Sequence, residues 1–127
     1  MRQVSKKRAA RNRECVAWRQ QLIARVRRCE VCGRQPWLWD WYLCVHEIAR
    51  GTNREKAIDQ AYAVLVVDHK CHEELGSKKE WPVSRQLWAL RRSRPQDFDL
   101  AAYLALAHPN APLAITPEEI DAWTDTL

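Results

Sequence analysis

Residues 63–75 read AVLVVDHKCHEEL and contain two predicted elements in direct succession. The apolar run at the start of this stretch is typical of a short, fully buried strand. The residues after it predict a helix that ends near Gly76. The junction carries four side chains of the kinds that bind metal ions: Asp68, His69, Cys71 and His72. The stretch therefore predicts a strand and a helix that meet at a metal-type site.

A second strand is predicted upstream, where tryptophans alternate with other residues. Trp37, Trp39 and Trp41 recur at a period of two, which is typical of a strand. Their common face could be one buried side of a sheet or a platform on which bases stack. A short helix is predicted around Thr52 and Glu55, which have the spacing of a capping box. Two strands followed by a helix, with metal-type residues at the junctions, form a ββα-metal arrangement.

Cysteines supply the most specific local motif, because only two residues separate Cys29 from Cys32. Two thiolates at this spacing on a turn can bind one zinc ion, which takes four ligands in a tetrahedron. Asp68 and Cys71 have the spacing of a second pair, and His69 is the rival fourth ligand. The alternative is that no zinc binds and the cysteines are small core residues. The chain has five Cys, an odd count that favours thiols or metal ligands over disulfides.

Positive charge is concentrated at the N-terminus. Residues 1–28 contain ten Lys or Arg and one acid, a net charge of +9, whereas the whole chain carries +5. The remainder is therefore acidic, at −4. This segment is predicted to comprise a disordered arm up to about residue 7 and a helix over residues 5–26. A localised basic segment is typical of nucleic-acid binding, although a solvated helix face or a disordered tail has the same composition.

The remaining residues predict a mostly helical tail on a single domain. Helix-like patterns occupy residues 81–93, 97–107 and 116–123, the last with a capping box at Thr116. No repeat or long linker divides the chain, so one domain is expected over residues 1–127. Its parts are a basic arm and helix (1–28), a metal-type unit (29–77) and a helical C-terminal extension (78–127).

The apolar residues of this chain favour neither a membrane-spanning segment nor a secretory signal. Hydrophobic residues make up 46%, which is enough for one core, but no run approaches the roughly 18 apolar residues of a membrane span. No apolar segment follows the N-terminal charges, so a secretory signal is not expected. A cytoplasmic location and no membrane partner are therefore predicted.

Taken together, the motifs resemble the HNH endonucleases of phages and bacteria. The resemblance is carried by VSKKRAARNREC (4–15), CEVCG (29–33), VHEIARG (45–51) and CHEEL (71–75). That family combines a basic N-terminal helix, a CxxC pair, a His-His stretch and a terminal CxxCH motif. The resemblance covers roughly residues 4–75. It implies an α+β, mostly helical fold with a ββα-metal (His-Me finger) core, to which a basic N-terminal helix and a helical C-terminal tail are attached.

The resemblance also implies roles for individual residues. His46 matches the first His of the motif and would bind a catalytic cation such as Mg²⁺, with His72 as its partner ligand. The CxxC-type positions match the ligands of a structural Zn²⁺. Glu47 stands where the general-base His is expected, so either Glu47 or His46 itself would act as the base. Two further positions depart from the family pattern, because Asp68 replaces a zinc Cys and Ala63 falls near the motif's Asn.

These observations favour an HNH-like endonuclease that hydrolyses phosphodiester bonds of DNA with a divalent metal. The alternative is a catalytically inactive HNH-fold module that binds zinc and serves DNA binding or assembly. Double-stranded DNA is the expected partner, contacted through its phosphates, although the sequence does not separate DNA from RNA. The candidate contacts are Lys6, Lys7, Arg8, Arg11, Arg13, Arg50 and Arg54. The C-terminal helices could offer a surface for a dimer or a protein partner.

Overall fold

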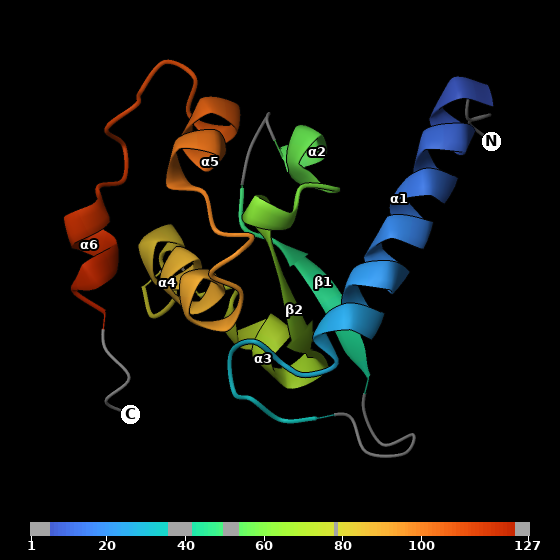
Figure 1. The fold of residues 1–127 in the computed structure, drawn as a ribbon, viewed down its shortest axis with the longest axis horizontal. Helices are drawn as coiled ribbons and strands as arrows, with labels where there is room; N and C mark the ends of the chain where they lie inside the picture. The colour runs from blue at the N-terminus through green and yellow to red at the C-terminus, as the bar shows by residue number, and fades with distance from the viewer. Residues whose placement is uncertain (1–5, 36–41, 50–53, 78, 124–127) are drawn as a thin grey trace.

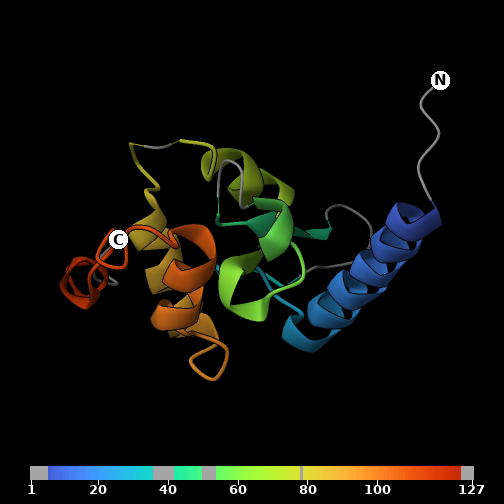
Figure 2. The ribbon, with the colours of Figure 1, turned by 90° about the horizontal axis from the view of Figure 1, so that it is seen from above.

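The computed structural model describes residues 6–35, 42–49, 54–77 and 79–123 of the 127-residue chain. It is a small α+β fold in which a two-stranded antiparallel sheet lies among helices. The long helix α1 stands on one side of the sheet, and α4, α5 and α6 lie on the other (Figure 1). Figure 2 shows the same separation from above. The expected α+β class, with helices predominating, is therefore confirmed.

Helix α1 (Lys6–Val26) forms where apolar residues recur at helical spacing. Cys15 and Leu22 on this stripe are buried against the rest of the molecule. The helix ends at Val26, and the next residue, Arg27, adopts the left-handed conformation with φ of 63°. Its backbone N–H donates to the carbonyl of Ile23 at 2.8 Å, a common way to close a last helical turn. The helix predicted up to residue 26 is confirmed.

The sheet pairs β1 (Leu43–Glu47) with β2 (Val64–Asp68), and the register places His46 opposite Leu65. Strand β2 is buried at every position, as its uninterrupted apolar sequence predicts. Strand β1 combines buried and half-buried residues. The strand predicted over the alternating tryptophans falls on residues 36–41, outside the described part of the chain. The partner of β2 begins just after them and itself carries the candidate histidine.

Three short helices complete this region: α2 (Arg54–Ala57), the 3₁₀ helix η2 (Ala61–Ala63) and α3 (His69–Glu74). Asp68 caps α3, because its side-chain oxygen accepts a hydrogen bond from the backbone N–H of Cys71 at 2.7 Å. Helix α3 ends at Glu74, so the helix predicted to end near residue 76 is confirmed. The capping box predicted before α2 lies outside the described residues. The order strand, strand, helix follows the chain from β1 through β2 to α3.

The C-terminal extension folds into α4 (Val83–Ser93), α5 (Leu100–Ala107) and α6 (Pro117–Asp121). Asp99 caps α5 through a hydrogen bond from the N–H of Ala102. Helix α6 begins with the predicted capping box at Thr116. All three predicted helices are confirmed. One cluster of buried side chains includes residues of α1, the sheet and these three helices.

A buried ion pair joins the C-terminal extension to the sheet and to the turn after α1. Nε of Arg94 donates to Glu30 Oε2 at 2.8 Å, and both side chains are almost fully buried. The guanidinium also donates to the carbonyls of Val64 and Ala61 at 2.6 and 3.1 Å. The other oxygen of Glu30 accepts the N–H of Val66 at 2.7 Å. The pair is thus satisfied on both sides, which a buried charge requires.

Candidate metal centre and histidine pair

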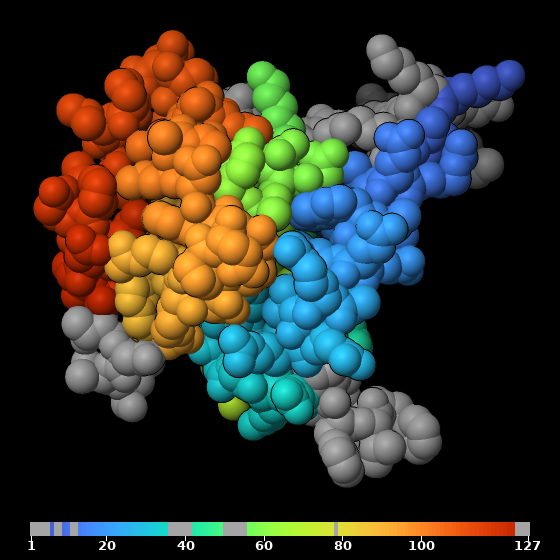
Figure 3. All heavy atoms as spheres, in the orientation of Figure 1, coloured from blue at the N-terminus to red at the C-terminus, as the bar shows by residue number. Residues whose placement is uncertain are grey.

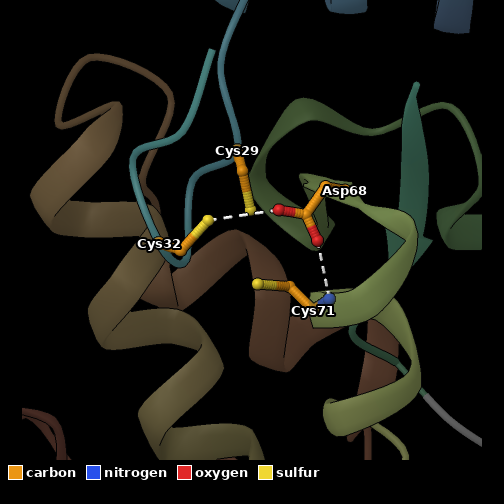
Figure 4. Close-up of side chains that lie close together, drawn as sticks. All are labelled: Cys29, Cys32, Asp68 and Cys71. Carbon is orange, nitrogen blue, oxygen red and sulfur yellow. Dashed lines mark hydrogen bonds between the residues drawn. The ribbon is translucent and has the colours of Figure 1, made fainter. Parts of the chain in front are cut away.

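Four potential metal ligands from two distant segments meet in a cluster, which we name the Cys/Asp cluster: Cys29, Cys32, Asp68 and Cys71. The first two lie on the turn after α1, and the others lie at the end of β2 and at the start of α3 (Figure 4). Their ligand atoms all lie within 4.8 Å of one another. Zn–S bonds of about 2.3 Å in a tetrahedron place sulfur atoms roughly 3.8 Å apart. The cluster therefore has the number and kind of donors that a metal ion such as zinc takes, at distances close to those of a zinc site.

His69, the rival fourth ligand, is not a member of this cluster. Its imidazole is exposed, with Nε2 3.4 Å from Oε1 of Glu73. Its ring centroid lies 6.0 Å from that of Tyr42. Of the two alternatives that the sequence leaves open, the geometry favours Asp68.

The turn that carries Cys29 and Cys32, which we name the knuckle (residues 29–33), has the backbone that two adjacent ligands need. The N–H of Gly33 donates to the carbonyl of Cys29 at 2.9 Å, and Gly33 has φ of 78°. Glycine adopts this left-handed conformation without the strain that a Cβ brings. The N–H of Glu30 donates to the carbonyl of Val66 at 2.7 Å. That bond attaches the knuckle to β2, so both pairs of ligands belong to one local assembly.

Asp68 uses its two oxygens for different partners. Oδ1 accepts the N–H of Cys71 at 2.7 Å, and Oδ2 accepts the thiol of Cys32 at 3.2 Å. Burial opposes ionisation of this carboxyl, but the hydrogen bonds from Cys71 and Cys32 outweigh burial and lower its pKa below the ordinary value. Asp68 is therefore a carboxylate at neutral pH, the form that binds a cation.

Two thiols of the Cys/Asp cluster have raised pKa values, in contrast to the lowered pKa of Asp68. Burial raises the pKa of Cys71, and the neighbouring thiols Cys29 and Cys32 raise it further. Burial is also the main cause of the raised pKa of Cys32. Thiolates packed this closely repel one another, whereas a coordinated divalent cation holds thiols in the deprotonated form. The cluster therefore gains most from a ligand that brings positive charge.

A second group of candidate residues, the histidine pair, consists of His46 on β1 and His72 on α3. The two ring centroids are 5.3 Å apart and the ring planes are inclined at 70°. His46 is half-buried and His72 is exposed. Imidazole suits a wide range of divalent metals, and two rings this close can contribute to one site. The two residues predicted to share a cation are thus brought together by β1 and α3.

Glu47, the residue that replaces the expected histidine, forms a salt bridge with α1. Its Oε1 lies 2.8 Å from a terminal nitrogen of Arg19, with side-chain exposures of 15% and 27%. Nε of Arg19 also donates to the carbonyl of Ile58 at 3.3 Å. Neighbouring residues of a strand point to opposite faces, so Glu47 contacts α1 whereas His46 contacts α4. Sequence reasoning did not pair these two residues.

Gln86 is a residue of this site that sequence reasoning missed altogether. It lies on α4, is fully buried, and places its Oε1 2.9 Å from Nε2 of His46. Its amide nitrogen donates to the carbonyl of Trp81 at 2.9 Å. The available signal was a polar residue on the buried face of an apolar helix, four positions before Leu90. That signal marks Gln86 as unusual but does not name its partner.

The basic residues proposed to contact DNA are described only in part. Lys6 and Arg13 are exposed on α1, which runs along one edge of the molecular surface (Figure 3). Two other arginines of the N-terminal segment are engaged: Arg19 with Glu47, and Arg25 with Asp97 at 2.9 Å. The side chains of the other candidates, Lys7, Arg8, Arg11, Arg50 and Arg54, lie outside the described part of the structure.

Comparisons with protein-family models, with curated proteins and with solved structures found no match for this chain. Among the described residues, no helix combines the length and apolar character that crossing a membrane requires. The structure therefore supports a small α+β fold with a cluster that can hold a metal ion such as zinc.

Proposed function

We propose that this protein is an HNH-like endonuclease that hydrolyses phosphodiester bonds of DNA with a divalent cation. The observation that carries the proposal is the histidine pair, whose ring centroids are 5.3 Å apart on β1 and α3. The chain order β1, β2, α3 agrees with the strand–strand–helix core that the sequence resemblance implies. The adjoining Cys/Asp cluster fits the structural zinc site expected beside such a core.

The proposed division of labour follows from the positions of the side chains. His46 and His72 would hold a cation of the Mg²⁺ type, which offsets charge on the scissile phosphate and on the leaving oxygen. Glu47 adjoins His46, and its salt bridge with Arg19 fixes the carboxylate. This bridge directs the carboxylate toward α1, so Glu47 would have to exchange Arg19 for the water molecule whose proton it accepts as a general base. His46 is the alternative base, with Glu47 then acting as the ligand.

Binding to DNA is assigned to the exposed basic residues of α1. Lys6 and Arg13 are exposed on this helix. Contacts from Lys and Arg to phosphates release counterions, so their contribution to affinity falls steeply with added salt. They also carry no base information. We therefore expect tight binding at low salt with little dependence on DNA sequence.

Nicking of supercoiled plasmid by the purified chain tests the proposal. The reaction is run with Mg²⁺, Mn²⁺ or Ni²⁺ and with EDTA, and the variant His72→Ala is compared with His69→Ala. The two histidines are three residues apart on α3 and both are exposed, but only His72 faces His46. Metal-dependent nicking should persist in His69→Ala and disappear in His72→Ala. Equal nicking by both variants would refute the assignment of the histidine pair.

A second candidate function, a DNA-binding or assembly module without catalysis, is favoured by one observation. Ala63 lies near the position of the motif's Asn and is fully buried. An alanine side chain can neither coordinate a cation nor hydrogen-bond to the catalytic residues. This candidate predicts salt-sensitive DNA binding in a gel-shift assay and no cleavage with any of the three ions. Cleavage that depends on His72 excludes it.

A further inference from the structure

Gln86 is a buried amide whose two ends both have polar partners. Gln86 is 0% exposed. It belongs to α4, in the C-terminal extension, which lies beyond the stretch that resembles the nucleases. Oε1 lies 2.9 Å from His46 Nε2, and Nε2 of Gln86 lies 2.9 Å from the carbonyl oxygen of Trp81. A buried amide without partners is costly, so these two contacts explain how a glutamine can occupy the core.

The partner of one end fixes the orientation of the whole amide. The backbone carbonyl of Trp81 can only accept a hydrogen bond, so the NH₂ group of Gln86 must face it. Oε1 must then face His46, and an amide oxygen can only accept. The Nε2 atom of His46 must therefore carry a hydrogen and donate it to Gln86.

This chain of hydrogen bonds selects one form of the imidazole. With a hydrogen on Nε2, a neutral His46 has its lone pair on Nδ1. Only that nitrogen can then bind a cation or accept a proton. Histidines that bind metals commonly donate their other ring N–H to an oxygen acceptor, which fixes the tautomer and the ring orientation.

We propose that Gln86 is the positioning residue that holds His46 in its Nε2–H tautomer and so makes Nδ1 the reactive nitrogen. The functional meaning of this assignment rests on the proposed nuclease role of His46. It extends the site beyond β1 and α3, because the residue that orients the first histidine belongs to α4. The C-terminal helices are then a part of the site and not only a covering of the sheet.

Nitrogen NMR of the imidazoles tests the assignment without any need for cleavage. The chain has four histidines, and the signals of His46 are those that disappear in His46→Asn. In the wild-type protein, Nε2 of His46 should have the chemical shift of a protonated nitrogen and Nδ1 that of an unprotonated one. In Gln86→Met, which has a similar volume and no acceptor, both shifts should move toward the averaged values of a free imidazole.

A second variant keeps the test sound if Gln86→Met does not fold. Gln86→Glu retains an oxygen acceptor opposite His46, although it loses the donor to Trp81, and it should keep the Nε2–H tautomer. A wild-type His46 protonated on Nδ1 would overturn the proposal. Identical shifts in wild type and a folded Gln86→Met would also overturn it.

Titration with Mn²⁺ tests whether Gln86 affects the affinity of the histidine pair for a cation. Loss of a hydrogen bond that orients a metal-binding histidine costs about 10–100-fold in affinity. Line broadening of the His46 and His72 signals by added Mn²⁺ should therefore need about that much more metal in Gln86→Met. A wild type that holds the Nε2–H tautomer but never cleaves DNA would contradict the nuclease function alone. A wild type that cleaves with the other tautomer would contradict the role of Gln86 alone.

Discussion

The Cys/Asp cluster and the histidine pair share helix α3, but different parts of the chain hold them in place. In the cluster, the ligands and their turns bind one another: Asp68 caps α3 and accepts the thiol of Cys32. The histidine pair is positioned from outside, because Gln86 of α4 contacts His46 and Arg19 of α1 holds the adjoining Glu47. The cluster is thus held by its own members, which come from the knuckle and from the junction of β2 and α3, whereas the pair depends on helices at both ends of the chain.

This difference has a consequence for stability and for activity. Loss of a cluster ligand should act first on folding, since the knuckle, β2 and α3 all meet there. Loss of a contact to the histidine pair should act first on chemistry, because its members lie at the edge of the buried core. The two regions can therefore be separated by mutations that change one and spare the other.

Removal of the metal ion should produce the largest effect. We expect the purified chain to hold one zinc ion, and Cys29→Ser or a strong chelator to remove it. Structural zinc contributes on the order of 10 kcal/mol in zinc-finger peptides. That is comparable to the whole stability of a typical domain, roughly 5–15 kcal/mol. Zinc content by mass spectrometry and thermal unfolding by circular dichroism provide the measurement.

Cys15→Ser is the matched control for the zinc experiment. Cys15 is buried on α1 and is not a member of the cluster. This variant should keep its zinc and should respond to the chelator as the wild type does. A wild-type chain that contains no metal, and whose Tm is unchanged by the chelator, would show that the three thiols and the carboxylate are not a metal site.

Loss of the buried ion pair between the knuckle and the C-terminal extension should cause the next largest loss of stability. Arg94→Met removes the partner of Glu30 and leaves a carboxylate in the core with its counter-charge gone. Breaking a buried pair from one side costs about 3–5 kcal/mol. Urea unfolding of the variant against wild type measures this loss.

The exposed ion pair of α4 offers a control for Arg94. Arg91 lies 2.6 Å from Asp121, with side-chain exposures of 35% and 62%. Exposed pairs of this kind contribute about 0–1 kcal/mol, so Arg91→Met should be nearly neutral. Equal losses in Arg91→Met and Arg94→Met would mean that the buried pair does not join the two regions as described.

Local patterns were sufficient to predict most of the elements and the members of the Cys/Asp cluster. The apolar run of β2, the helical spacing of α1 and the capping box at Thr116 depend only on neighbouring residues. The cluster joins segments 36 positions apart, but each of its two ligand pairs has a short spacing that is visible in the sequence. Such features can be read from sequence because the physical interactions that produce them span only a few residues.

The contacts that position the histidine pair could not be predicted, because each joins residues far apart in the chain. Gln86 is 40 positions from His46, and Arg19 is 28 positions from Glu47. Nothing in the local sequence of Glu47 distinguishes a carboxylate in a salt bridge from one facing solvent. The preference for Asp68 over His69 also needed coordinates, since both residues are acceptable zinc ligands.

A substitution of Glu47 tests whether this carboxylate is the general base of DNA cleavage. Glu47→Gln keeps the size of the side chain and removes its charge, so it should lower the cleavage rate by about 100-fold, the scale of a lost general base. DNA affinity should not change, and the folding free energy should fall by only about 1 kcal/mol, because the bridge to Arg19 is partly exposed. Single-turnover cleavage of a labelled duplex measures the rate.

Arg19→Gln separates the carboxylate from its salt bridge. This variant breaks the same ion pair as Glu47→Gln but leaves the carboxylate in place. A smaller loss of rate in Arg19→Gln than in Glu47→Gln is therefore expected. If Glu47→Gln cleaves as fast as wild type, the base is another group, and His46 becomes the candidate.

Substitutions of Asp68 should have the smallest effects on the metal-free protein and specific effects on zinc binding, because this residue both caps α3 and offers an oxygen to the metal. Asparagine caps helices as well as aspartate does, so Asp68→Asn should keep the metal-free stability that Asp68→Ala loses, about 1 kcal/mol. Both variants should bind zinc more weakly, whereas Asp68→Cys should bind it at least as well as wild type while losing the cap. Competition with a coloured chelator measures the affinities. If Asp68→Asn binds zinc as wild type does, Asp68 acts only as the cap, and the three cysteines hold the ion with a fourth donor from elsewhere.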